Sequence, residues 1–177
     1  MLLLKWLAGG FGQFQFKRWL DKNASHVLSA VGVEEGKAVL DLGCGSGTYT
    51  IPAAKLVGDD GRVYALDVSR KALDRMEEKA EREGLKNIVR IDSSAGEKIP
   101  LEDETVDVML LIDVLQEIDD RSALFDEAYR ILRQGGVVIV YAMHIEAEEV
   151  EKLATSKGLD TEDRQFEGRI LVFRKIS

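Results

Sequence analysis

The stretch AVLDLGCGSG, residues 38–47, decides the fold. Its first five residues form a short, mainly apolar run, which is typical of a strand buried on both faces of a sheet. Three glycines follow at alternate positions, where they permit a tight turn and a close approach of the backbone to a ligand. A helix expected over residues 48–57 would present free N–H groups there. The stretch therefore predicts a ligand-binding turn between a strand and a helix.

The same order of strand, turn and helix recurs along the chain. Further strands are expected at residues 62–66, 87–91, 106–112 and 137–142, with helices between them and a final pair of strands at 161–166 and 169–176. Gly135 and Gly136 are expected to end one of the helices. Alternating strands and helices predict an α/β fold with a doubly wound, mostly parallel, seven-stranded sheet and a C-terminal antiparallel hairpin. Ligands should bind after Leu42, Leu66, Ile91 and Ile112, at the carboxyl ends of the strands.

The glycine spacing distinguishes between classes of cofactor. Gly43, Gly45 and Gly47 follow the order G-x-G-x-G, whereas dinucleotide sites use G-x-G-x-x-G and phosphate loops need Gly-Lys-Ser/Thr. Asp67 ends the next strand, twenty positions after Gly47, where a carboxylate can accept hydrogen bonds from both hydroxyls of a ribose. The alternative is a carboxylate that only precedes the helix cap Ser69. Together with the glycines, Asp67 favours a nucleoside site.

Composition excludes several classes of function. The 177 residues carry a net charge of -8, which argues against binding nucleic acid in general. The single cysteine, Cys44, excludes an internal disulfide framework and any multi-cysteine metal site, so no metal is predicted. We expect no membrane-spanning helix and no secretory signal, and therefore a cytoplasmic location.

The first 36 residues are expected to form a helical cap segment on a cofactor-binding domain at 37–177. Apolar residues recur at helical spacing from Phe16 to Val31, and residues 1–37 have five basic and three acidic side chains. One hypothesis is that Phe11, Phe14 and Trp19 line an apolar substrate pocket. In the alternative, Trp19 simply packs on the sheet. A third use is peripheral contact with a membrane surface or a partner.

Four motifs, in this order, resemble those of class I S-adenosylmethionine-dependent methyltransferases. They are VLDLGCGSG at 39–47, ALDVS at 65–69, IPLEDETVD at 99–107 and YRILRQGG at 129–136. The similarity covers roughly residues 36–142. It is greatest to the small-molecule branch with ubiquinone/menaquinone-type enzymes, called methyltransferase type 11.

This resemblance implies a Rossmann-like fold and S-adenosylmethionine as cofactor, with S-adenosylhomocysteine as product. The family often has Asp-Ala after the third strand where this chain has Ser94-Ala95, so Asp92 and Glu97 are alternatives for holding the adenine. The implied cofactor-binding residues are Asp41, Gly43, Cys44, Gly45, Gly47, Asp67, Val68, Ser94, Ala95 and Ile112.

The implied reaction is an in-line displacement that moves a methyl group from sulfur to a small, apolar acceptor. The protein must align the acceptor and exclude water, and a base is needed only if the acceptor loses a proton. Asp113 and Glu117 are the candidate catalytic residues, ahead of His144. Two alternatives are a cofactor-binding but inactive regulatory or scaffold protein and a nicotinamide-dependent oxidoreductase, which the glycine spacing disfavours. The oligomeric state is left open.

Overall fold

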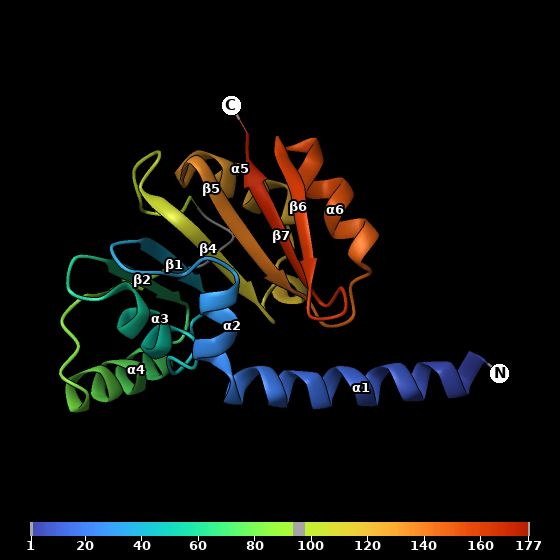
Figure 1. Ribbon diagram of the computed structural model, residues 1–177, viewed down its shortest axis with the longest axis horizontal. Coiled ribbons are helices and arrows are strands. Elements are labelled where there is room, and N and C mark those ends of the chain that lie inside the picture. Colours follow the sequence, from blue (N-terminus) through green and yellow to red (C-terminus); the bar gives the residue numbers. More distant parts are fainter. Residues whose placement is uncertain (1, 94–97, 177) are drawn as a thin grey trace.

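A single seven-stranded sheet forms the centre of the molecule (Figure 1). The structure is a computed structural model that describes residues 2–93 and 98–176. Strand order is β3-β2-β1-β4-β5-β7-β6; the first five are parallel, and β7 runs antiparallel to β5 and β6. The predicted fold class is confirmed. The strands are β1 (Ala38–Leu42), β2 (Arg62–Asp67), β3 (Ile88–Asp92), β4 (Val106–Ile112), β5 (Leu132–Tyr141), β6 (Leu159–Gln165) and β7 (Ile170–Lys175).

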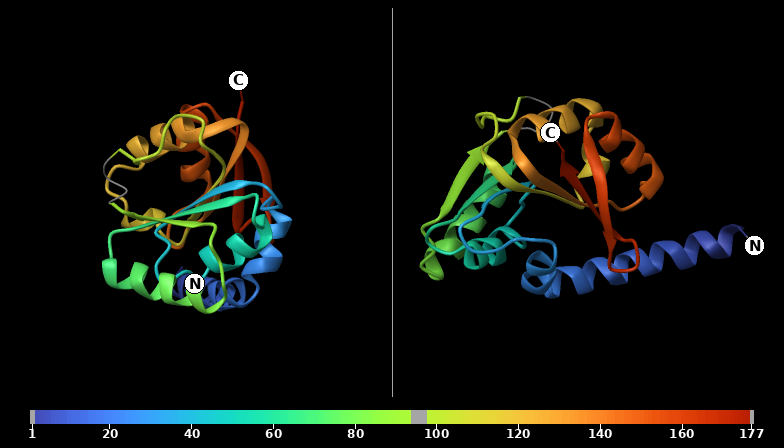
Figure 2. Two further views of the ribbon diagram at one scale, coloured as in Figure 1. Left: turned by 90° about the vertical axis from the view of Figure 1, so that its left-hand side faces the viewer. Right: turned by 45° about the horizontal axis from the view of Figure 1, so that its top comes forward.

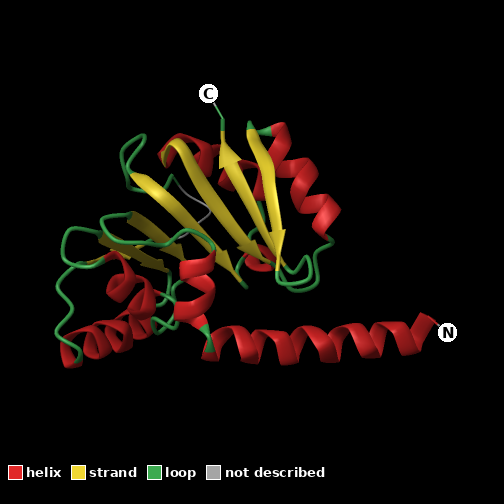
Figure 3. Ribbon diagram, in the orientation of Figure 1, coloured by secondary structure: helices red, strands yellow, loops and turns green. Residues whose placement is uncertain are grey.

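Helices cover both faces of this sheet (Figures 2 and 3). Those before β3 lie on one face, and those after β4 lie on the other. On the first face are α1 (Leu2–Lys22), α2 (Ala24–Ala30), α3 (Thr50–Val57) and α4 (Arg70–Arg82). On the second are α5 (Arg121–Ile131) and α6 (Ala147–Ser156), with a 3-10 turn at Leu115–Glu117 before them.

Local sequence accounts for the central elements. Every residue of β1 is buried, and β4 is buried except at Asp107, as expected for strands between two helix layers. Helix α4 begins where predicted, because the Ser69 hydroxyl accepts a hydrogen bond from the Ala72 N–H at 3.3 Å. These elements place the carboxyl ends of β1, β2 and β4 side by side.

The expectation that Gly135 and Gly136 end a helix is wrong. Helix α5 ends at Ile131 and β5 begins at Leu132, so both glycines lie inside the strand. The pairing of β4 with β5 is irregular here. A Cβ on Gly136 would lie 2.9 Å from the Arg133 carbonyl oxygen and 3.0 Å from that of Asp107. Glycine is therefore required for close backbone packing rather than as a helix stop.

Helix α1 is long and only partly attached to the body. It runs through three glycines near its middle, and its first half extends past the β6–β7 hairpin (Figures 1 and 2). Its second half is attached by the buried Leu20 and by Phe16, whose ring lies 5.5 Å from that of Tyr141. Among the described residues, no helix combines the length and apolar character needed to cross a bilayer. The division of the chain at residue 36 stays a prediction.

Candidate active site

A cavity of about 540 Å³ opens at the carboxyl ends of the parallel strands. It lies where the strand order reverses, because β1 pairs with β2 on one side and with β4 on the other. Ligands of doubly wound sheets bind at this position. We call it the strand-end cavity; it is lined by Leu42, Gly43, Leu66, Asp67, Val68, Ser93, Asp113, Val114, Glu117, Ile118, Asp119 and Asp120. Most of the strand-end positions expected from the sequence therefore lie at this cavity.

Asp67 ties the glycine turn to the end of β2. One carboxylate oxygen accepts from the Gly45 N–H at 2.7 Å, and the other accepts from the Ser69 N–H at 2.8 Å. The Leu66 carbonyl oxygen holds the same turn, because it accepts from Gly43 at 2.8 Å and from Cys44 at 3.1 Å. The side chain that was predicted to hold a ribose thus also fixes the backbone next to it.

The three glycines of the turn have different surroundings, although all have positive φ. A Cβ on Gly43 would lie 2.6 Å from Val114, and one on Gly47 would lie 2.7 Å from Met76. A Cβ on Gly45 would meet no protein atom within 4 Å. The outer glycines thus permit close packing, whereas the middle one leaves an open side. Cys44 is buried between β2 and α4, so its thiol is part of the core.

Asp41 is buried at the end of β1, outside the lining of the cavity. Its side chain accepts a hydrogen bond from the Thr50 hydroxyl at 2.6 Å. Burial raises the pKa of Asp41 to about 6; the Thr50 hydrogen bond opposes this rise, and the nearby charge of Asp67 adds to it. A carboxyl group with a raised pKa binds its proton more tightly in the folded state than in the unfolded chain.

Asp41→Asn should therefore change how stability depends on pH. In the natural chain, the contribution of Asp41 is greatest below about pH 4 and is lost as pH rises through about 6, with a total on the order of 3 kcal/mol. The variant lacks this loss. The melting temperature of the variant minus that of the natural chain should therefore increase as the pH is raised from 4.5 to 7.5. Thermal melts across this range measure it, with exposed Asp60→Asn as the control. Parallel curves for Asp41→Asn and the natural chain would contradict the assignment.

The candidate catalytic residues both line the strand-end cavity. Asp113 directly follows β4 and has φ of 58°, a left-handed conformation that aspartate adopts more readily than most residues. Its N–H donates to the Tyr141 carbonyl oxygen at 2.7 Å, and its carboxylate accepts from Gln116 at 2.8 Å. Glu117 is exposed at the cavity mouth. His144 is also exposed and does not line this cavity, whereas Ile112 is buried at the end of β4.

Helix α1 brings a polar stripe to these strand ends. Gln13, Lys17 and Asp21 are spaced by four residues and share one face of the helix. The backbone carbonyl oxygen of Gln13 accepts from the Tyr141 hydroxyl at 3.1 Å. Burial raises the pKa of Tyr141 to about 12, so this hydroxyl keeps its proton at neutral pH. The stripe therefore begins over the end of β5.

The stripe continues over β4 and the glycine turn. Lys17 Nζ lies 2.7 Å from Asp21 and 3.9 Å from Asp113. Asp21 also accepts from the Tyr49 hydroxyl at 2.6 Å, just after the glycine turn. Apolar spacing does not predict this network; its signal in the sequence is the polar pair Lys17 and Asp21, four residues apart.

Two of the three aromatic residues that were predicted to line a substrate pocket do not line the strand-end cavity. Phe14 is 58% exposed and Trp19 is 40% exposed, and neither lines it. Trp19 instead packs against Phe166, at 5.6 Å between ring centroids. The side chain of Phe11 lies outside the described part, as do Ser94 and Ala95, the predicted adenine residues, and the alternative Glu97. Their neighbour Ser93 does line the cavity.

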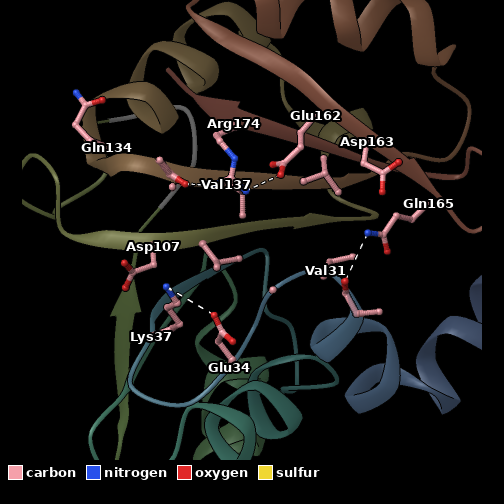
Figure 4. A pocket seen from close by; sticks show the side chains of 16 residues that line it. Val31, Glu34, Lys37, Asp107, Gln134, Val137, Glu162, Asp163, Gln165 and Arg174 are labelled. Atoms are coloured by element: carbon pink, nitrogen blue, oxygen red, sulfur yellow. Dashed lines mark hydrogen bonds and ion pairs between the residues drawn. The ribbon is translucent and has the colours of Figure 1, made fainter. Parts of the chain in front are cut away.

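A second pocket, of about 350 Å³, lies at the opposite ends of the strands (Figure 4). It lies between the turn before β1, the start of β5 and the β6–β7 hairpin. Several of its charges are already paired, such as Lys37 with Glu34 at 3.9 Å and Arg174 with Glu162 at 2.6 Å. It is therefore a weaker candidate than the strand-end cavity for a charged ligand.

The family model for a methyltransferase domain matches residues 33–168. The chain belongs to this methyltransferase family. It is 34% identical over 124 residues to a demethylmenaquinone methyltransferase of Geobacillus sp. (strain WCH70), covering 70% of this chain and 52% of that protein. It is 30% identical over 115 residues to a ubiquinone/menaquinone biosynthesis C-methyltransferase of Marinomonas sp. (strain MWYL1), covering 65% and 46%. The methyltransferase domain thus spans about half the length of these curated relatives.

A solved structure also resembles the methyltransferase domain over most of its length. A SAM-dependent methyltransferase from Aquifex aeolicus superimposes with a TM-score of 0.77 and 26% identity, covering 89% of this chain and 92% of that one. The predicted family, the class I methyltransferases, is confirmed by the family match.

The strand-end cavity fits the cofactor of this class. Its volume lies within the usual range for small-molecule sites. Five carboxylates line it, and no lysine or arginine is among its described lining residues. Such a surface favours a ligand with a positive sulfonium and ammonium group. Asp67, the residue predicted to hold the ribose, lines this cavity, and Gly45 leaves open space beside it.

Proposed function

We propose that this chain transfers a methyl group from S-adenosylmethionine to a small, apolar acceptor. The observation that carries the proposal is Asp67, which faces a carboxylate-lined cavity at the sheet's reversal point while fixing the glycine turn. The names of the relatives support a small-molecule acceptor. The two described above name demethylmenaquinone and ubiquinone/menaquinone biosynthesis. Another relative, 32% identical over 120 residues, is a probable cobalt-precorrin-6B C(15)-methyltransferase of Saccharolobus solfataricus. These names differ, so the family alone leaves the acceptor open.

In the proposed complex, Asp67 accepts hydrogen bonds from the ribose hydroxyls. The Gly43–Gly47 turn lies along the methionine part, with Asp41 and Cys44 supporting the turn from the core and Ile112 at the end of β4. Val68, which is 71% exposed at the cavity, offers an apolar surface to the flat base. Ser94 and Ala95 keep their predicted role at the adenine.

When bound, the cofactor supplies a methyl group already activated by the positive sulfur. The chain's own residues then have to align the acceptor and exclude water. Asp113 is held by Gln116 and by the Tyr141 carbonyl, so its carboxylate has a fixed position at the end of β4. We assign Asp113 and Glu117 to orient the acceptor and to take up its proton where one is released. The polar stripe of α1 supports the proposed cap, because it contacts the ends of β5 and β4 and the residue before α3.

The cavity's charge opposes the oxidoreductase alternative. A nicotinamide dinucleotide would place its anionic pyrophosphate near Asp67, Asp113 and three further carboxylates. Like charges at short distance in a partly buried site are unfavourable. A cytoplasmic location and a peripheral membrane contact of α1 stay predictions.

Calorimetry and a transfer assay test the function in two steps. We expect S-adenosylhomocysteine to bind with a dissociation constant of about 10 μM, equivalent to a binding free energy of about -7 kcal/mol, and NAD to show no binding. Transfer of a labelled methyl group to a panel of aromatic and polycyclic acceptors then measures turnover. Binding without any transfer would favour the inactive scaffold, whereas lack of S-adenosylhomocysteine binding would refute the proposal.

A further inference from the structure

A separate cavity of about 340 Å³ lies next to the proposed methyl-transfer site, on the far side of β5. It is bordered by residues 12–13 of α1, the end of β5, the start of α6 and the start of β7. We call it the β5–α6 cavity. Its walls combine an aliphatic group, Val140, Ala142, Ile145, Val150 and Leu171, with polar groups.

This cavity adjoins the strand-end cavity through one pair of residues. Tyr141 lines the β5–α6 cavity, and Asp113 lines the strand-end cavity. The Tyr141 carbonyl oxygen accepts from the Asp113 N–H at 2.7 Å. An acceptor in the β5–α6 cavity would therefore lie beside the end of β4, where the methyl group is proposed to be presented.

Arg169 provides a cation beside this aliphatic group. Its side chain is partly buried, donates one hydrogen bond to the Gly12 carbonyl oxygen at 3.0 Å, and lies 4.8 Å from the centre of the Phe16 ring. No described carboxylate lies within 4.0 Å of it. By contrast, the side chains of Arg90 and Arg130 are also partly buried, and the guanidinium group of each contacts carboxylates.

Attachment of α1 does not by itself require an arginine at position 169. A neutral donor would satisfy the Gly12 carbonyl, whereas an arginine has five N–H donors in a planar array suited to a carboxylate. Glu146, the carboxylate that lines this cavity, is exposed and makes no described ion pair with Arg169. A partly buried positive charge is best stabilised by an anion with which it shares hydrogen bonds.

We propose that the β5–α6 cavity binds the methyl acceptor, and that the acceptor joins an apolar ring or chain to a carboxylate that pairs with Arg169. This inference rests on the proposed methyl-transfer function. It assigns Arg169 as a specificity-determining residue and the aliphatic wall as the site for the apolar part.

The probes are naphthalene-2-carboxylate and the neutral naphthalene-2-carboxamide, which have nearly the same shape. Each is titrated into the full chain by NMR, with and without saturating S-adenosylhomocysteine. In the natural chain, we expect the carboxylate to bind about ten-fold more tightly than the amide, because charge-assisted pairs exceed neutral ones. Arg169→Gln should remove this preference, Arg169→Lys should keep part of it, and the exposed control Arg18→Gln should leave it unchanged.

A measurement on the natural chain covers the case in which Arg169→Gln does not fold. The Arg169 Nε–H signal should shift on addition of the carboxylate but not of the amide. Equal binding of the two probes, or a carboxylate preference that persists in Arg169→Gln, would overturn the proposal. A loss of S-adenosylhomocysteine affinity in Arg169→Gln, with carboxylate binding retained, would instead assign Arg169 to the cofactor. Failure of S-adenosylhomocysteine to bind the natural chain would refute the proposed function, while the cofactor-free titrations would still decide this inference.

Discussion

Asp67→Asn should lower the affinity for S-adenosylhomocysteine by about 100-fold. Hydrogen bonds to a charged group contribute about 1.5–3 kcal/mol each, and the ribose offers two hydroxyls. The substitution also disturbs the free protein, because Asp67 accepts from both Gly45 and Ser69. Asparagine has a single acceptor oxygen, so its amide N–H₂ would face one of these two backbone donors. Calorimetric titration with S-adenosylhomocysteine measures the loss.

Asp119→Asn is the matched control for Asp67→Asn. It removes one negative charge from the same cavity, but Asp119 makes no described contact with the glycine turn. Its effect should stay within about three-fold, as expected for an exposed charge. Equal losses in the two variants would mean that the cavity's general charge, rather than the position of Asp67, governs binding.

Gly43→Ala should destabilise the fold by about 3 kcal/mol. The new Cβ would lie 2.6 Å from Val114 Cγ2, and the residue has φ of 74°. A left-handed conformation costs an alanine about 1 kcal/mol, and overpacking of a core adds about 1–3 kcal/mol. Urea unfolding measures the change in free energy.

Two further variants separate steric overlap from backbone strain. Gly84→Ala has a similar φ of 69° with no atom within 4 Å of the new Cβ, so it should cost only about 1 kcal/mol. Adding Val114→Ala to Gly43→Ala removes the clashing methyl groups and should restore part of the lost stability. If Gly43→Ala and Gly84→Ala cost the same, the contact with Val114 has no energetic weight.

The central strands could be predicted because each is buried through a run of consecutive, mainly apolar residues. The apolar runs of β1 and β4 indicated strands covered on both faces, and the structure confirms both. Gly136 shows where this fails: its φ is ordinary, and glycine is needed there because the backbone packs against the carbonyls of Arg133 and Asp107. That requirement depends on how β4 and β5 pair, which periodicity along one segment does not contain.

The glycine turn and Asp67 could likewise be predicted from the sequence, whereas the contacts of α1 could not. The glycine turn and Asp67 belong to consecutive strand–helix units, so their meeting follows from the order of elements. The contacts of α1 join distant parts of the chain: Gln13 with Tyr141, and Gly12 with Arg169. A helix with both aromatic and polar faces does not reveal which face it turns to the sheet until the whole fold is known.

The spacing of Gln13, Lys17 and Asp21 makes α1 sensitive to changes of length within a short window. Each contacts a different segment near the strand ends, and neighbours among the three are separated by slightly more than one helical turn. One residue inserted between positions 13 and 21 would rotate the part before it by about 100° and break this alignment. An insertion before residue 12 would leave all three contacts in place and only lengthen the part that extends beyond the body. We therefore expect the segment from 13 to 21 to keep a fixed length, whereas the part before residue 12 can lengthen without loss of these contacts.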